Sequence, residues 1–199
     1  MQDNYRIQSQ QAKAHFLQYD QQALIKKHHL QADDTYLYFT FLGAPYRICR
    51  KNGDLSFLQD LHWMDAESHG EIMTVLDLIC DSREDRHLSG RLQNMQAFGH
   101  QFHQNLGENN PDALFIQSRF QTFRAACESM GGTPFPLGDL AYTFPVFEDL
   151  NVTLQFFMGD EEFKPRLLYL WDENALQYLK YETMYYAVDA LMGKLKEKL

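Results

Sequence analysis

Two groups of short strand-forming runs indicate a fold that contains β-sheet as well as helix. The first group covers 35–41 and 46–50, and the second covers 141–144, 152–157 and 166–171. Each run is rich in β-branched and aromatic residues and is bounded by turn residues. The first group continues through Asn52-Gly53, the dipeptide that most favours a tight hairpin turn, to a further run at 55–58, which gives two or three strands. We therefore expect two sets of antiparallel strands.

Four other stretches carry helical patterns. They are residues 10–28, the stretch after Ser68-x-x-Glu71, residues 110–130 and residues 179–196. Ser68 and Glu71 have the spacing of a capping box, and Asn110-Pro111 is a favourable helix start. Together these patterns predict an α+β fold with mostly antiparallel sheets and about four helices. We expect a single domain over residues 1–199, in which 1–34 is an N-terminal helical segment.

Charge and composition exclude several kinds of partner. The chain of 199 residues has a formal net charge of −9, which disfavours nucleic acid and anionic membranes. The longest apolar run, Leu167 to Trp171, is far too short for a membrane helix, and the N-terminus lacks the pattern of a signal peptide. Three cysteines without a CxxC pair indicate reduced thiols. We expect a soluble, cytoplasmic protein.

Several short motifs resemble an uncharacterised bacterial and archaeal family, the domain of unknown function 3786. They are Phe41-Leu-Gly43, Leu88-Ser-Gly90, Gly131-Gly132 before Gly138-Asp139, Gly159-Asp-Glu-Glu-Phe163 with Pro165, Leu170-Trp-Asp172 with Ala175, and Tyr178-Leu179 before Glu182. The resemblance covers most of residues 35–192. It implies no activity, because none is established for the family. Some members carry a cysteine-rich iron–sulfur segment, which this chain lacks.

Acidic residues near the C-terminus are the first candidate ligand site. The candidate ligand-binding residues are Asp139, Asp160, Glu161, Glu162, Trp171, Asp172 and Glu182. Clustered carboxylates could bind a divalent cation or perform acid–base chemistry. The alternative is a solvated hairpin turn with Asp172 as a helix cap. A turn and a strand end lie at opposite ends of a strand roughly 20 Å long, which favours the alternative.

Histidines and cysteines give weaker signals. His100 and His103 have a spacing that could ligate a metal if helical, but surface histidines are the simpler reading. His28-His29 reads as a solvated pair at a helix end. No motif for a nucleophile, nucleotide or metal is complete, so catalytic residues and cofactors are unassigned and no metal is predicted. The residues do not decide whether the chain is an enzyme.

Aromatic residues suggest a binding surface. Those in the predicted strands are Tyr36, Tyr38, Phe39, Phe41, Phe156, Phe157, Tyr169 and Trp171. An uncovered sheet face would form an aromatic groove, whereas helices or a partner subunit would bury it. The first hypothesis is a non-catalytic module for a small apolar or aromatic ligand. The alternatives are a carboxylate- or metal-dependent enzyme and an interaction protein or homodimer.

Overall fold

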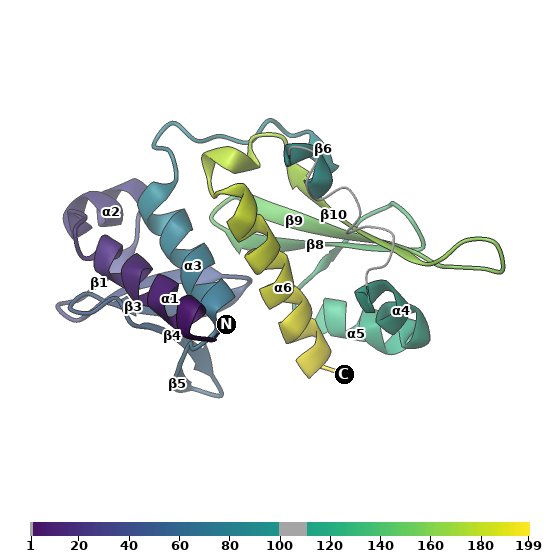
Figure 1. Cartoon of the computed structure of the whole chain (residues 1–199), viewed down its shortest axis with the longest axis horizontal. Helices are drawn as coiled ribbons and strands as arrows, with labels where there is room; N and C mark the ends of the chain where they lie inside the picture. Colours follow the sequence, from purple (N-terminus) through teal and green to yellow (C-terminus); the bar gives the residue numbers. More distant parts are fainter. Residues whose placement is uncertain (1, 100–110) are drawn as a thin grey trace.

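The computed structural model describes residues 2–99 and 111–199, which form two five-stranded antiparallel sheets and the helices around them (Figure 1). The first sheet contains β1 (Gln31–Ala32), β2 (Tyr36–Phe41), β3 (Ala44–Cys49), β4 (Leu55–Gln59) and β5 (His62–Asp65). Each of these strands pairs with the next one in sequence, so the sheet is a simple meander. Gly53 has φ +74 in the turn after β3, which explains the glycine at this position.

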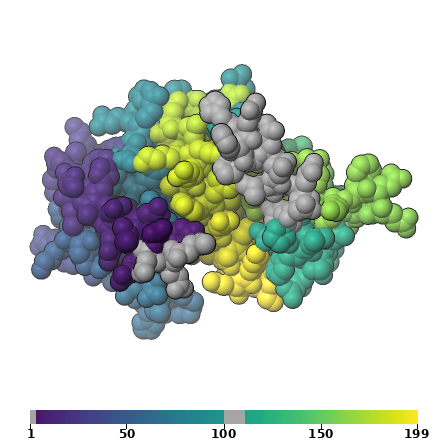
Figure 2. All heavy atoms as spheres, viewed as in Figure 1, coloured from purple at the N-terminus to yellow at the C-terminus, as the bar shows by residue number. Residues whose placement is uncertain are grey.

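The second sheet has the strand order β6-β10-β9-β8-β7. Its strands are β6 (Leu92–Asn94), β7 (Thr133–Pro134), β8 (Leu140–Phe147), β9 (Leu150–Phe157) and β10 (Arg166–Asp172). Both faces of β9 are buried, because Thr153 and Gln155 are buried along with their apolar neighbours Leu154 and Phe156. The β9–β10 hairpin projects well beyond the body of the molecule (Figures 1 and 2).

The described residues contain six α-helices, so the prediction of about four was wrong. They are α1 (Gln2–Phe16), α2 (Gln21–His28), α3 (His69–Leu76), α4 (Pro111–Ser118), α5 (Phe120–Ser129) and α6 (Tyr181–Glu197). Two of the predicted helices are each divided. Asp20 starts α2 by accepting hydrogen bonds from the backbone N–H groups of Gln22 and Ala23, and Arg119, with φ −134, interrupts the helix between α4 and α5. The α+β class with antiparallel sheets is confirmed.

Helices α1 and α3 lie over the first sheet, α6 packs beside α3 in the middle of the molecule, and α4 and α5 lie next to the second sheet (Figure 1). Leu37, Tyr46 and Ile48 are fully buried beneath these helices. The other face carries the alternating residues of the same strands, which are only partly buried or exposed. One cluster of buried apolar side chains extends across both sheets. Among the described helices, none combines the length and apolar character that crossing a membrane requires.

Helix α6 begins at a cap supplied by a distant residue. A π-helical turn, Asp77–Asp81, continues α3, and Asp77 Oδ2 accepts hydrogen bonds from the backbone N–H of Lys180 at 2.7 Å and from the hydroxyl of Thr183. The Lys180 ammonium lies 2.8 Å from Asp77 Oδ1 and also pairs with Asp81. Burial opposes the charged form of Lys180, but these two carboxylates outweigh it and raise its pKa. Packing of α6 therefore depends on a carboxylate 103 positions earlier.

Candidate functional site

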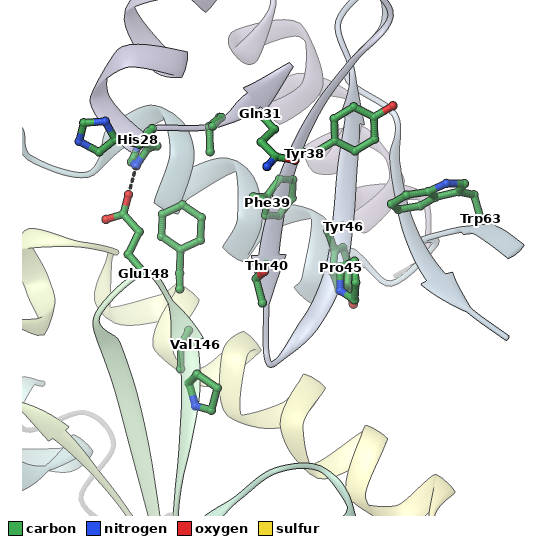
Figure 3. A pocket seen from close by; sticks show the side chains of 14 residues that line it. His28, Gln31, Tyr38, Phe39, Thr40, Pro45, Tyr46, Trp63, Val146 and Glu148 are labelled. Carbon is green, nitrogen blue, oxygen red and sulfur yellow. Dashed lines mark hydrogen bonds and ion pairs between the residues drawn. The ribbon is translucent and has the colours of Figure 1, made fainter. Parts of the chain in front are cut away.

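A cavity of about 610 Å³ lies between the first sheet and the β8–β9 turn (Figure 3). We call it the aromatic groove. Its lining residues are His28, His29, Leu30, Gln31, Tyr38, Phe39, Thr40, Pro45, Tyr46, Trp63, Pro145, Val146, Phe147 and Glu148. The first sheet is held against β8 by a hydrogen bond from the Leu42 N–H to the Val146 carbonyl, 3.1 Å long. The volume suits a small organic molecule.

Aromatic rings form one end of the groove. Tyr38 and Trp63 stand near each other there (Figure 3), with their ring centroids 6.0 Å apart. Behind them the Arg47 guanidinium lies 3.9 Å from the ring centroid of Tyr36 and 4.3 Å from that of Trp63. A guanidinium stacked in this way is attracted by the negative faces of the rings. The side chains at this end therefore hold one another in place.

A charged cluster closes the opposite end. Glu148 Oε1 lies 2.7 Å from His28 Nδ1, the pair marked in Figure 3. Arg86 donates to both carboxylate oxygens of Glu148, with its Nε 2.9 Å from Oε2 and its second nitrogen 2.8 Å from Oε1. The three residues come from α2, from the segment after the π-helical turn and from the β8–β9 turn. They therefore connect the region of the first sheet with the second sheet directly beside the groove.

Hydrogen bonding fixes the ionised form of Glu148. Burial favours the neutral carboxyl, but hydrogen bonds from His28 and Arg86 outweigh it and lower the pKa of Glu148. The other ring nitrogen of His28, Nε2, lies 2.8 Å from the Ile79 carbonyl oxygen. His28 thus faces an oxygen acceptor on each side, and the imidazolium form can donate to both. The charge of Glu148 at this end of the groove is therefore balanced by Arg86.

Two residues at this end have a backbone conformation that is unfavourable outside glycine. His29 has φ 50 at the end of α2, and Glu148 has φ 51 in the β8–β9 turn. Such a left-handed residue costs about 1 kcal/mol, and strained residues of this kind cluster at functional sites. Both of them line the groove. The two strained backbone positions therefore belong to the walls of the aromatic groove.

A larger open cleft of about 1150 Å³ lies on the helical side of the first sheet. Three of its polar groups contact one another: the Tyr46 hydroxyl donates to Glu71 Oε1 at 3.1 Å, and the Lys194 ammonium lies 3.0 Å from the same oxygen. Lys194 also lies over the rings of Tyr46 and Phe57. These contacts tie α3 and α6 to the sheet, and they account for the buried Glu71 without a ligand.

Comparison with known proteins gives one match. The family model described as a domain of unknown function, DUF3786, matches residues 20–194. The chain belongs to this family. No curated protein and no solved structure matches it. Because DUF3786 is a family without an assigned function, membership adds no activity to what the geometry supports.

Two of the motifs that resembled DUF3786 meet in space. Asp172, at the end of β10, accepts hydrogen bonds from the backbone N–H groups of Ser89 at 2.9 Å and Gly90 at 2.8 Å. It also accepts from the Ser89 hydroxyl and from the Asn174 N–H. Burial favours the neutral acid, but these hydrogen bonds outweigh it and lower the pKa of Asp172. In this DUF3786 chain, Asp172 therefore holds the Ser89 loop against the second sheet.

The acidic hairpin of the DUF3786 chain lies away from Asp172. Asp160 forms the turn at its tip by accepting from the N–H groups of Glu162 and Phe163, both less than 3 Å away. Glu161 and Glu162 are exposed. Asp139 Oδ2 accepts from the Met158 N–H at the base of the hairpin, at 2.7 Å. Strand β10 separates this tip from Asp172, so the structure does not bring these carboxylates together.

The two remaining candidates have different surroundings. Trp171 is fully buried in the second sheet. Glu182 lines a pocket of about 340 Å³ that it shares with Asp77 and Lys180, between α1, α3 and α6. None of the seven residues predicted from the sequence lines the aromatic groove. Their role in ligand binding stays a prediction, while the groove contains two aromatic residues that the sequence did suggest, Tyr38 and Phe39.

Histidine and cysteine chemistry finds little support in the described part of this DUF3786 chain. No group of three or more His, Cys, Asp or Glu side chains there could hold a metal ion. Burial raises the pKa of the Cys80 and Cys127 thiols to about 12, which removes them as nucleophiles near neutral pH. His100 and His103 lie outside the described residues. The prediction that His28 is solvated was wrong, since its side chain is buried between Glu148 and the Ile79 carbonyl.

Proposed function

We propose that this DUF3786 chain is a binding module that holds a small planar aromatic molecule in the aromatic groove. The main support for this proposal is a cavity of about 610 Å³ whose walls include the rings of Tyr38, Phe39 and Trp63. Aromatic walls offer a ligand ring both apolar contact area and favourable stacking geometry. A few polar groups, including Gln31 and Thr40, are available to orient the ligand.

Rigidity of the walls supports binding. The charged cluster of His28, Arg86 and Glu148 fixes one wall, and stacking on Arg47 fixes Trp63 on the other. A cavity whose walls are already ordered loses little side-chain entropy when a ligand enters. The engaged carboxylates of Asp139, Asp160 and Asp172 favour binding over the carboxylate enzyme considered from the sequence. A cytoplasmic location belongs to the same proposal, because all three cysteines are unpaired.

Filling the groove tests this function. Thr40 is exposed on β2 and lines the groove, so Thr40→Trp places a large side chain within it. We expect at least one probe among indole, 4-hydroxybenzamide, 4-hydroxybenzoate and tyramine to bind the wild type in isothermal calorimetry. Thr40→Trp is expected to weaken that binding at least about tenfold, which corresponds to about 1.4 kcal/mol.

His62→Trp is the matched control, because His62 is exposed on β5 and lies outside the groove. It is expected to bind the same probe as the wild type does. Equal binding by all three proteins would place the probe elsewhere and refute the groove as the binding site.

The projecting hairpin favours self-association as a second candidate function. Phe163 is 68% exposed near its tip, and Met158 is 45% exposed at its base. The turn that presents Phe163 is ordered by Asp160, and a side chain on Gly159 would collide with Pro165 at 2.6 Å. An apolar ring held on an ordered projection can enter a socket on a second copy of the chain.

Sedimentation of variants separates this candidate from ligand binding. If the hairpin mediates self-association, the wild type should sediment as a dimer at tens of micromolar, and Phe163→Ser should sediment as a monomer with an unchanged melting temperature. Leu114→Ser, which removes a side chain that is 63% exposed on α4, should remain dimeric. A monomeric wild type would exclude this second function.

A further inference from the structure

The tip of the β9–β10 hairpin presents two carboxylates beside an aromatic ring. Glu161 and Glu162 are exposed, and Phe163, the next residue, is 68% exposed. Among residues 2–99 and 111–199, no ion pair within 4.0 Å includes either glutamate. The hairpin stands clear of the rest of the molecule (Figure 2). Its tip therefore carries negative charge and apolar surface that are both open to a partner.

Two arginines lie on the helices beside the base of the same hairpin. Arg119 directly precedes α5, Arg124 is within it, and both are exposed. The preceding helix, α4, contacts the hairpin base through a hydrogen bond from the Gly159 N–H to Gln117 Oε1, 2.7 Å long. Figure 2 shows the teal surface of α4 and α5 next to the base of the projecting hairpin. We call the surface around Arg119 and Arg124 the arginine patch.

The arginine patch rests on aromatic rings. The guanidinium of Arg119 lies 4.8 Å from the ring centroid of Phe115, and that of Arg124 lies 5.7 Å from that of Phe120. Both rings are only partly buried. In the described part of the chain neither arginine joins an ion pair within 4.0 Å. Glu128, the acid on α5, accepts a hydrogen bond from a tyrosine of β8 instead. The patch thus combines positive charge with apolar ring edges.

The hairpin tip and the arginine patch complement each other. The tip has two negative charges beside one exposed ring, and the patch has two positive charges over two partly exposed rings. A two-fold axis that sets two hairpins antiparallel brings each tip to the patch of the other copy, so one symmetry operation forms both contacts. Opposite charges across such a contact steer the encounter and fix its register.

We propose that two copies of the chain form a dimer in which the tip of each hairpin lies on the arginine patch of the other copy. This inference rests on the self-association given above as the second candidate function, and it adds the surface that receives the hairpin. In the dimer, Glu161 and Glu162 pair with the arginines of the patch, and Phe163 packs against the rings of Phe115 and Phe120.

Charge reversal at each surface tests this arrangement. The tip variant carries Glu161→Lys and Glu162→Lys, and the patch variant carries Arg119→Glu and Arg124→Glu. At tens of micromolar and low salt, the wild type should sediment as a dimer and each variant alone as a monomer, because surfaces of like charge then face each other. The tip variant is also less negative overall than the wild type, whose net charge is −9. General charge repulsion would therefore predict stronger association for it.

Mixing the two variants tests the reciprocal contact. An equimolar mixture should restore the dimer, because the positive tip of one variant meets the negative patch of the other, and the remaining tip and patch keep their original charges. Lys26→Glu with Lys51→Glu is the matched control for the patch variant, and Asp34→Lys with Glu84→Lys is the control for the tip variant. All four control residues are exposed and lie outside both surfaces. Both controls should remain dimeric, and melting temperatures check that every variant is folded.

The outcomes separate this arrangement from self-association in general. A monomeric wild type would refute both. A dimeric wild type whose folded patch variant also stays dimeric would refute the arginine patch as the receiving surface, while a monomeric Phe163→Ser protein would still support association through the hairpin. Folded tip and patch variants that are each monomeric but do not associate when mixed would refute the reciprocal contact.

Discussion

Replacing Asp172 by alanine is expected to lower the free energy of unfolding by about 3 kcal/mol, since it leaves several buried donors without an acceptor. Its carboxylate accepts from the N–H groups of Ser89, Gly90 and Asn174 and from the Ser89 hydroxyl. Asp172 is 5% exposed, so water cannot easily replace it. Urea denaturation measures the loss. Asp172→Asn keeps one acceptor oxygen and is expected to fall between wild type and alanine.

The pH dependence gives an independent check on Asp172. Because its pKa is lowered in the folded state, its contribution is complete above the unfolded pKa, about 3.9, and is lost as the pH falls through the lower folded pKa. Wild type should therefore lose more stability than Asp172→Ala between neutral pH and about pH 3. Glu161→Ala, at an exposed position of the hairpin tip, should match the wild type at every pH. A stable Asp172→Ala protein with altered ligand affinity would instead support the sequence-based ligand role.

Replacing Glu148 by glutamine is expected to cost about 2 kcal/mol, because it leaves the guanidinium of Arg86 without its counter-ion. The Arg86 side chain is only 10% exposed, and Glu148 is 25% exposed, which keeps the estimate below that of a fully buried pair. The substitution also replaces the charged acceptor of His28 by a neutral amide group. Thermal and urea unfolding should both report the change.

A double-mutant cycle with Arg86→Gln identifies the source of this loss. If Glu148 and Arg86 stabilise the fold through each other, the double variant should lose clearly less than the sum of the two single variants. Glu173→Gln and Arg91→Gln form the control pair: their ion pair is 2.6 Å long, but the Arg91 side chain is 76% exposed, so it should contribute less than about 1 kcal/mol. Additive losses at Glu148 and Arg86 would show that the cluster does not act as a unit.

Local sequence signals predicted the strands better than the helix boundaries. Asn52-Gly53 correctly marked a turn, because its chemistry depends only on neighbouring residues. The capping box at Ser68 is half formed: the Ser68 hydroxyl accepts from the Glu71 N–H at 3.4 Å, but the Glu71 carboxylate binds Tyr46 and Lys194 instead. The break at Arg119 carries no glycine or proline, so the sequence pattern gave no reason to divide that helix.

The candidate site was predictable only in its aromatic part. Alternation in β2 suggested that Tyr38 and Phe39 could line a groove, whereas His28 and Glu148 are 120 positions apart and share no local motif. Their pairing follows from the way β8 meets the first sheet. The acidic motif near Asp160 was the first candidate from the sequence, which nevertheless favoured a hairpin turn, and a turn organised by Asp160 is what the tip forms.

Because its cap comes from a distant residue, the start of α6 depends on tertiary structure. Lys180, in the cap position, has no side-chain bond of its own to the first turn, and the missing acceptor comes from Asp77 in the other half of the chain. The first turn of α6 can therefore be fully formed only while the π-helical turn is folded. Unfolding of the segment that contains the π-helical turn would fray α6 from its first residue. We therefore expect this N-terminal segment and α6 to unfold together as one cooperative unit.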